Sequence, residues 1–147
     1  MVQKLIAFFI ITIFSILFSM CSFNLSKYEY EYIGEYGVNM EKCLAMYPDF
    51  DTAKYAGLTL KIKPDYGYEA SKTFHRLTST KGKWYLKRID VAVCCHLVCK
   101  DGSVTQVGRD SDRGLMIAID SRMVGNPGAQ YREPIFLYLK KTKWERM

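Results

Sequence analysis

The residues with the most obvious chemical potential form one cluster, Cys94-Cys95-His96, followed three positions later by Cys99. Zinc and cuprous copper prefer thiolate and imidazole ligands, so these residue types suggest a metal- or thiol-handling site. The cluster lies in an alternating, β-branched run from Ile89 to Cys99, which predicts a strand rather than a helix. On a strand, Cys95 and Cys99 face one side, whereas Cys94 and His96 face the other. The spacing therefore places the four candidate ligands on two opposite faces of the strand, where all four cannot bind one metal ion together. Cysteines buried as small apolar residues are the simpler interpretation.

Groups able to move a proton near neutral pH are few, because the chain has only two histidines, His75 and His96. No serine or cysteine motif marks a nucleophile near His75, although the fold could still bring Cys94 or Cys99 and a histidine together as a dyad. Asp110 and Asp112 lie among interleaved arginines, which predicts a charged turn and not a calcium loop. We therefore expect a protein that is not an enzyme and that needs no cofactor.

The apolar residues gather at the N-terminus, where Leu5–Met20 contains no charged residue and follows a single Lys4. A helix of this length reaches about 24 Å, which is short of the ~30 Å hydrocarbon core of a bilayer. A compact apolar segment behind a positive residue is typical of a secretory signal, with an uncleaved membrane anchor as the alternative. The sequence thus divides into a signal or anchor at 1–20, a short tether at 21–27 and a single domain at 28–147.

The segment Phe18-Ser19-Met20-Cys21 follows this apolar stretch and resembles the lipobox of bacterial lipoprotein signal peptides. Ser19 matches the usual box, whereas Phe18 and Met20 differ from it. The resemblance implies that Cys21 becomes the lipidated first residue and carries acyl chains such as palmitate, which hold the protein at a membrane. With serine and not aspartate at position 22, it also implies an outer-membrane lipoprotein of the cell envelope, with its domain in the periplasm or outside the cell.

An exported domain meets oxidising conditions, so disulfides are expected among the four remaining cysteines. Cys95 and Cys99 are about 13 Å apart along a strand, too far to bridge. Cys43 lies on the apolar face of a predicted short helix that begins after Asn39, a favourable N-cap. We expect Cys43 to pair with Cys95 or Cys99 across the core.

The body of the chain alternates with period two between turn signals, which is typical of strands. We expect a mainly β fold, a small antiparallel meander or a barrel or roll of about six or seven strands with one short helix. Asp101-Gly102 predicts a two-residue hairpin turn that pairs Cys99 with Val104 and places Val107 near His96, and Lys81-Gly82 predicts a weaker turn. The predicted strands are Tyr28–Tyr32, Leu58–Ile62, Thr73–Thr80, Lys83–Arg88, Ile89–Cys99, Leu115–Ile119 and Ile135–Leu139.

Two further groups of residues suggest contact surfaces. Tyrosine provides contact area at low entropic cost, so a surplus of tyrosines suggests protein recognition; the candidates are Tyr28, Tyr30, Tyr32, Tyr66 and Tyr68. The chain has a formal charge of +6 and a basic tail that suggests a membrane-facing patch, or otherwise a solvated strand edge; the tail residues are Lys140, Lys141, Lys143, Trp144 and Arg146. Nucleic acid is a poor partner for an exported protein.

These observations favour a membrane-tethered envelope lipoprotein that binds another protein, in an inhibitor or immunity role or in envelope assembly. The alternative is a periplasmic thiol or metal handler built on the cluster at positions 94–99.

The lipobox resemblance yields a direct prediction for Cys21→Ala. The parent chain should incorporate labelled palmitate and mature to a shorter form, whereas the variant should take up no label and keep its full length, because the acceptor thiol is gone. Metabolic labelling followed by gel migration measures both. A parent chain without label and with unchanged migration in the variant would favour the uncleaved anchor.

Overall fold

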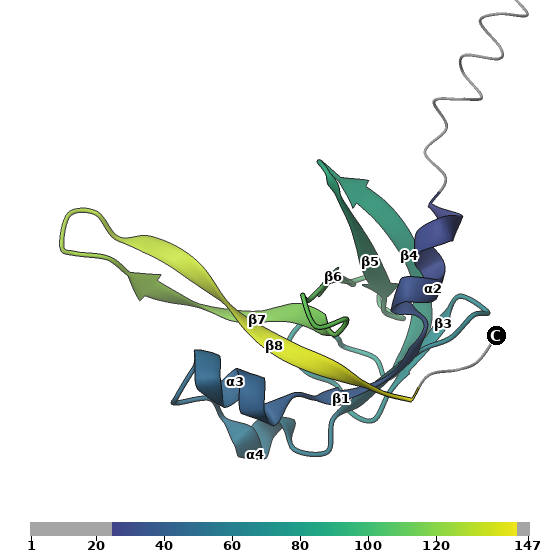
Figure 1. Cartoon of the computed structure of the whole chain (residues 1–147), viewed down its shortest axis with the longest axis horizontal. Coiled ribbons are helices and arrows are strands. Elements are labelled where there is room, and N and C mark those ends of the chain that lie inside the picture. The colour runs from purple at the N-terminus through teal and green to yellow at the C-terminus, as the bar shows by residue number, and fades with distance from the viewer. Residues whose placement is uncertain (1–24, 144–147) are drawn as a thin grey trace, which may run out of the picture.

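The computed structural model describes residues 25–143, which form a closed, antiparallel eight-stranded barrel with three short helices. Each strand pairs with its neighbour in sequence, and β1 pairs with β8 to close the ring (Figure 1). The elements are α2 (Ser26–Tyr32), β1 (Gly34–Val38), α3 (Met40–Met46), α4 (Thr52–Tyr55), β2 (Thr59–Ile62), β3 (Gly67–Ala70), β4 (Lys81–Ile89), β5 (Ala92–Val98), β6 (Val104–Arg109), β7 (Leu115–Val124) and β8 (Tyr131–Lys143).

The expected fold class is confirmed, since the protein is mainly β and its antiparallel meander closes as a barrel. The expected counts were too low, for both strands and helices. The signal or anchor segment, Cys21, Trp144 and Arg146 lie outside the described residues. Within the described part of the chain, no helix is both long and apolar enough to cross a membrane.

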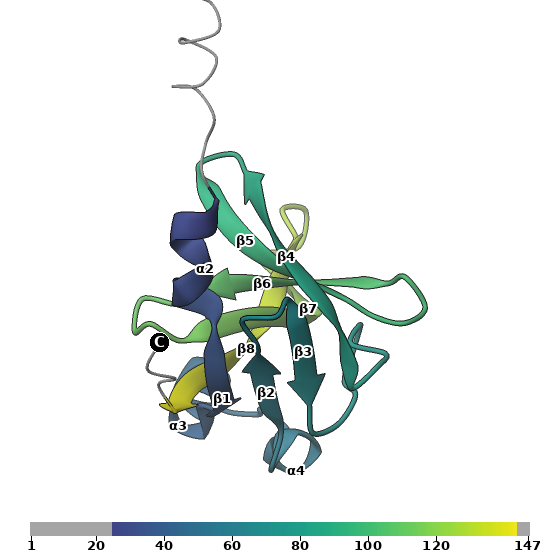
Figure 2. The ribbon, with the colours of Figure 1, turned by 90° about the vertical axis from the view of Figure 1, so that its right-hand side faces the viewer.

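Inward-facing side chains fill the barrel, as an interior of eight strands allows. Opposed residues share a face, so Tyr36 lies beside Leu60 and the inward stripe continues from strand to strand. Tyr32 and Tyr36 are completely buried at the end where α2 lies. The Tyr32 hydroxyl donates to the Val93 carbonyl at 2.5 Å, and the Tyr36 hydroxyl donates to the Tyr32 carbonyl at 2.7 Å. Figure 2 shows α2 against this end of the barrel.

The segment predicted as a Tyr28–Tyr32 strand is instead helix α2. Alternating tyrosine and glutamate also satisfies a helix, because residues four apart share a face and Tyr28 and Tyr32 therefore lie together. Burial of Tyr32 in the barrel decides in favour of the helix.

The predicted Ile89–Cys99 strand is broken by a two-residue turn at Asp90-Val91, where Asp90 adopts a φ of 52°. Ile89 pairs with Ala92, so β4 and β5 form a hairpin. Asp tolerates this left-handed conformation better than most residues, which is why the turn forms there.

The Asp101-Gly102 hairpin exists, but its register differs by one residue from the prediction. Val98 and not Cys99 pairs with Val104, and the Cys99 amide donates to the Ser103 carbonyl. Gly102 takes a φ of 82° and donates to the Cys99 carbonyl, so the loop has three residues, with glycine at the left-handed position. A slip of one residue exchanges the two faces of a strand. It places Gln106, not Val107, opposite His96.

The hairpin predicted at Lys81-Gly82 is wrong, because both residues lie inside β4. A Cβ at Gly82 would sit 2.2 Å from the Val98 carbonyl oxygen and 2.6 Å from the Tyr68 ring, so glycine serves a close approach. The preceding segment 73–80 is a loop with one isolated bridge between Phe74 and Leu77.

Helix α3 forms where it was predicted, with the Asn39 side chain accepting from the Lys42 amide at 3.2 Å. It covers the β8 edge beyond the end of β1. The Tyr138 amide donates to Cys43 Sγ at 3.4 Å, and the Phe136 amide donates to the Tyr47 hydroxyl at 3.0 Å.

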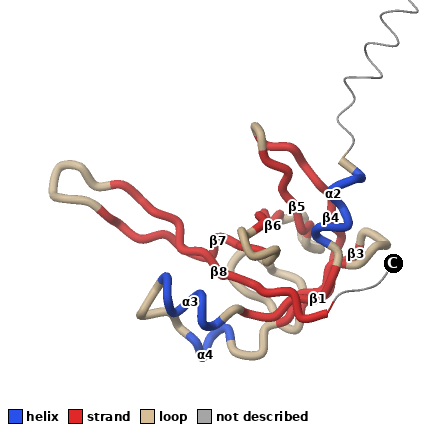
Figure 3. Tube along the Cα trace, viewed as in Figure 1, coloured by secondary structure: helices blue, strands red, loops and turns tan. Residues whose placement is uncertain are grey.

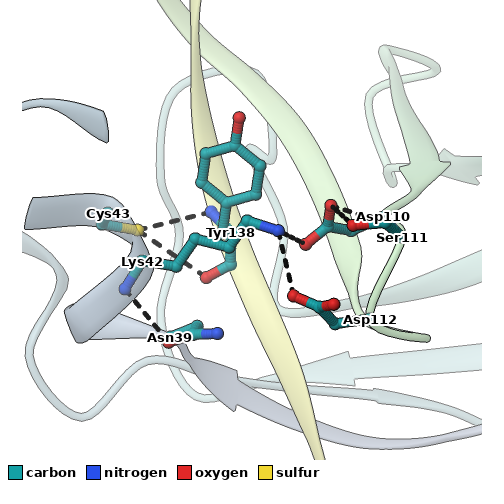
Figure 4. Close-up of polar contacts among 7 residues, drawn as sticks. All are labelled: Asn39, Lys42, Cys43, Asp110, Ser111, Asp112 and Tyr138. Atoms are coloured by element: carbon teal, nitrogen blue, oxygen red, sulfur yellow. Dashed lines mark hydrogen bonds and ion pairs between the residues drawn. The ribbon is translucent and has the colours of Figure 1, made fainter. Parts of the chain in front are cut away.

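Asp110 and Asp112 lie in the β6–β7 turn, where Lys42 pairs with both carboxylates at 2.5 and 3.2 Å (Figure 4). The charged turn therefore fastens α3 to the barrel.

The β7–β8 hairpin is longer than the barrel wall and projects from it as an arm (Figures 1 and 3). The register between these strands shifts at Ile119, and their pairing continues to Val124 and Tyr131. Residues 125–130 close the arm.

Burial of α2 predicts unequal effects for two tyrosines of one helix. Tyr32→Ala should lower the free energy of unfolding by about 3–5 kcal/mol, because it empties a buried aromatic site. Tyr30→Ala should change it by no more than about 0.5 kcal/mol, because Tyr30 is 57% exposed. Urea titration of the full chain in detergent measures both, and equal losses would contradict the packing of α2 described above.

Candidate functional site

The candidate site is a groove of about 730 Å³ on the outer wall of the barrel, across β5, β6, β7 and β8. The loop between β3 and β4 closes one side. The lining residues are His75, Arg76, Cys94, His96, Val104, Thr105, Gln106, Gly108, Met116, Ala118, Asp120, Ser121, Pro134 and Phe136. Volumes of this order suit a small ligand or a few side chains of a partner.

His96 is the most informative side chain in the groove, because it is buried and only partly hydrogen bonded. Its Nδ1 lies 3.1 Å from the Tyr85 hydroxyl, and the two rings are 5.1 Å apart. Its Nε2 is buried without a partner. Burial, and secondarily the charge of Lys87, lower the pKa of His96, so the ring is neutral at neutral pH.

A second buried polar atom that lacks a partner is the Thr105 hydroxyl, but Thr105 is opposite Leu97 and therefore shares the inward face of the wall. Of the described residues, only three have such a side-chain atom, and the third is the Arg109 Nε. Arg109 lies at the other end of β6, where its guanidinium pairs with Glu31. Native proteins leave few buried polar groups unpaired, so the unpaired His96 Nε2 indicates a place for an external hydrogen-bonding group on the outward face of β5.

The rest of the groove combines apolar and weakly polar surface. Gln106 Nε2 donates to Cys94 Sγ at 3.4 Å, which connects β6 with β5. Met116 and Phe136 are partly buried and pack against the core. A mixed surface with a few placed polar groups is typical of recognition sites.

The structure separates the four residues of the cysteine–histidine cluster. Cys94 and His96 face the groove, whereas Cys95 and Cys99 belong to the core. Within residues 25–143, no group of three or more histidine, cysteine, aspartate or glutamate side chains is placed to hold a metal ion. Among the described residues, His96 hydrogen bonds to Tyr85 and not to a thiol, so no cysteine–histidine dyad forms there.

The expected disulfide between Cys43 and Cys95 or Cys99 is absent, because all four described cysteines are free thiols. Cys43 Sγ lies at the backbone edge of β8, against Tyr138 (Figure 4), whereas Cys95 lies on β5 and Cys99 directly follows that strand. All three thiols belong to the buried core, but Cys43 is held at a different strand from the other two.

The thiols also differ in acidity. Burial raises the pKa of Cys43 and of Cys95. Burial acts in the same direction on Cys99, but hydrogen bonds from Tyr68 and other polar neighbours outweigh it and lower the pKa of Cys99 to about 6. Cys99 is only 4% exposed, so this acidic thiol is enclosed by the fold.

The tyrosine surface does not form as predicted, because Tyr32 and Tyr68 are buried in the barrel. Tyr30 and Tyr66 are exposed, Tyr28 is half-buried, and Tyr66 donates to Glu29 of α2. None of these five tyrosines lines the groove.

The basic tail is likewise divided. Lys140 and Lys143 are exposed on β8, whereas Lys141 is half-buried with its Nζ 5.6 Å from the centre of the Tyr36 ring. The described part of the tail is the end of strand β8, and its role at a membrane stays a prediction.

Sequence reasoning found Cys94, His75 and His96 but missed the contributions of β6, β7 and β8. The alternating pattern was the available signal, but the register error assigned the wrong partner to His96. No protein-family model matches the chain, and no curated protein or solved structure matches it either.

His96 predicts a pH dependence of stability. Its pKa is lower in the folded state than the value of about 6.5 in the unfolded chain, so the unfolded state binds more protons just below pH 6.5. Stability should therefore fall as the pH decreases from 7 to 5, and His96→Gln should remove part of this fall.

Urea titrations across this pH range give the measurement, with His75→Gln on the exposed loop as the matched control. An unchanged pH dependence in His96→Gln would contradict the buried, neutral imidazole.

Proposed function

We propose that this protein is a membrane-tethered, non-enzymatic module of the cell envelope that binds a segment of a partner protein in the groove across β5–β8. The observation that carries the proposal is the unpartnered His96 Nε2 on the strand face that lines this concave surface. A partner that supplies hydrogen bonds there recovers the cost of leaving buried polar groups unpaired.

The groove also has the rigidity that recognition requires. It rests on the barrel wall, where β5 and β6 pair from Cys95 to Val98 and continue into the packed core. Sites on strands keep their geometry better than sites on loops. The apolar groups Met116 and Phe136 provide contact area beside the polar ones.

The tether is supported by the lipobox resemblance and the apolar N-terminal segment. Helix α2 begins the described chain close after Cys21 and packs at one end of the barrel, so the groove on the side wall stays accessible. A protein held at a membrane meets partners at a high effective concentration, which makes a modest groove sufficient.

The test places a photo-crosslinking amino acid at Gln106 of the full chain in intact cells, with Thr59 on β2 as the matched position away from the groove. We expect one discrete crosslinked protein from position 106 and none from position 59. Ala118→Trp, which fills the groove without changing the core, should reduce that product at least tenfold, equivalent to ~1.4 kcal/mol.

Thr59→Trp is the control for added bulk and should leave the yield unchanged. Equal products from both crosslinking positions, or a product that resists Ala118→Trp, would contradict binding in the groove.

A further inference from the structure

The two edges of the projecting arm differ. On the β8 side, β1 pairs with residues 139–143, and α3 satisfies Tyr138 and Phe136. On the β7 side, β6 pairs only with Leu115–Ile117, so beyond Ile117 the pairing of β7 is with β8 alone. An uncovered strand edge is a template for another strand.

The register identifies which backbone groups face this open edge. The amides of Phe136 and Tyr138 point away from β7, toward Tyr47 and Cys43. The polar backbone groups of every second residue in a strand point to the same side, so the carbonyl of Pro134 also points away from β7. Ser121 is opposite Pro134 and therefore faces away from β8, as does Met123 two residues later. The Ser121 amide donates to its neighbour's carboxylate, Asp120 Oδ1, at 2.8 Å.

The sequence of this edge is complementary to itself. When Ile119-Asp120-Ser121-Arg122-Met123 is aligned antiparallel with a second copy about Ser121, Asp120 lies opposite Arg122 and Ile119 lies opposite Met123. Directly opposed side chains in antiparallel strands are about 4.5–5.5 Å apart at Cβ, and opposite charges there are favourable. The two-fold axis repeats each of these pairs.

We infer that a second copy of this chain pairs with the open β7 edge, antiparallel and centred on Ser121, to form a symmetric dimer. Arg122 can take part because its present ion pair, with Glu133 at 3.0 Å, joins two side chains that are each more than 40% exposed. Exposed pairs are weak. The pair uses only the guanidinium Nε, and the guanidinium carbon lies 5.5 Å from the centre of the Tyr47 ring. Arg122 therefore turns away from Tyr47 to present its other N–H groups to Asp120 of the second copy.

A five-residue ladder is small beside a standard protein interface, so the dimer is weak in dilute solution. Exposed Met123, 54% accessible, adds apolar contact at each end of the ladder. The inference does not rest on the proposed groove function, because it uses only the arm. Asp120 and Ser121 also line the groove, so the second copy borders it.

Charge reversal gives the sharpest test, with the full chain in detergent and sedimentation velocity up to about 1 mM. Asp120→Arg and Arg122→Asp each place like charges opposite one another, so each variant alone should associate at least tenfold more weakly than the parent. An equimolar mixture of the two variants should dimerise again, because each supplies the charge that the other lacks. The double variant should dimerise alone.

A parent chain that stays monomeric over this range overturns the inference, and so does a mixture that stays monomeric. Circular dichroism of each variant excludes misfolding as the cause.

The register has its own test by oxidation of introduced thiols. Ser121→Cys places the new thiols opposite one another and should form an intermolecular disulfide, whereas two copies of Met123→Cys lie about 13 Å apart and should not. The parent chain, oxidised in the same way, shows how much disulfide its native cysteines form and serves as the control. Crosslinking from position 123 equal to that from position 121 overturns the two-fold pairing. Groove variants such as His96→Gln should leave the association unchanged, which separates this result from the proposed function.

Discussion

Closure of the barrel between β1 and β8 is the constraint on which the other features depend. β1 has only five residues, yet it must pair with β2 on one side and β8 on the other. A ring of eight strands also encloses a volume that side chains must fill. Tyr36 from β1 and Tyr32 from α2 do this at one end, and their hydroxyls bond to backbone carbonyls, so large rings are accommodated without unpaired polar groups.

The exposed features follow from strands that are longer than closure requires. β6 has six residues, whereas β7 has ten and β8 has thirteen. The surplus length of β7 and β8 cannot pair with the ring, so it leaves the wall as an arm. The groove lies where these lengths diverge. Cys43 of helix α3 and Tyr47, which follows the helix, protect one edge of the arm, and natural sheets commonly cover their edges in this way. Beyond Ile117, β7 pairs with β8 alone, and this open edge is the one that we propose pairs with a second copy of the chain.

Local patterns were predictable where one physical signal dominates. Alternation at Leu60 and Ile62 predicted β2, and Asn39 predicted the start of α3. The strand predicted over Tyr28–Tyr32 was wrong because the spacing of its tyrosines fits both a strand and a helix. Only the burial of Tyr32 inside the closed barrel distinguishes the two. The Asp101-Gly102 turn shows a second limit. The same dipeptide supports loops of two or three residues, and this single choice determines whether Gln106 or Val107 faces His96. The groove could not be assembled from sequence for that reason.

Strand β5 shows why the groove, and not the cysteine cluster, is the stronger functional candidate. Its inward residues Cys95 and Leu97 are completely buried, so stability accounts for their presence. Its outward residue His96 is nearly as buried but keeps one ring nitrogen unpaired, and an orphaned polar group costs on the order of 1–3 kcal/mol. No contact within the described part of the chain offsets the cost of the unpaired His96 Nε2. A bound partner that pairs with Nε2 would recover the cost, and the affinity gained would be specific to a group placed by the barrel wall.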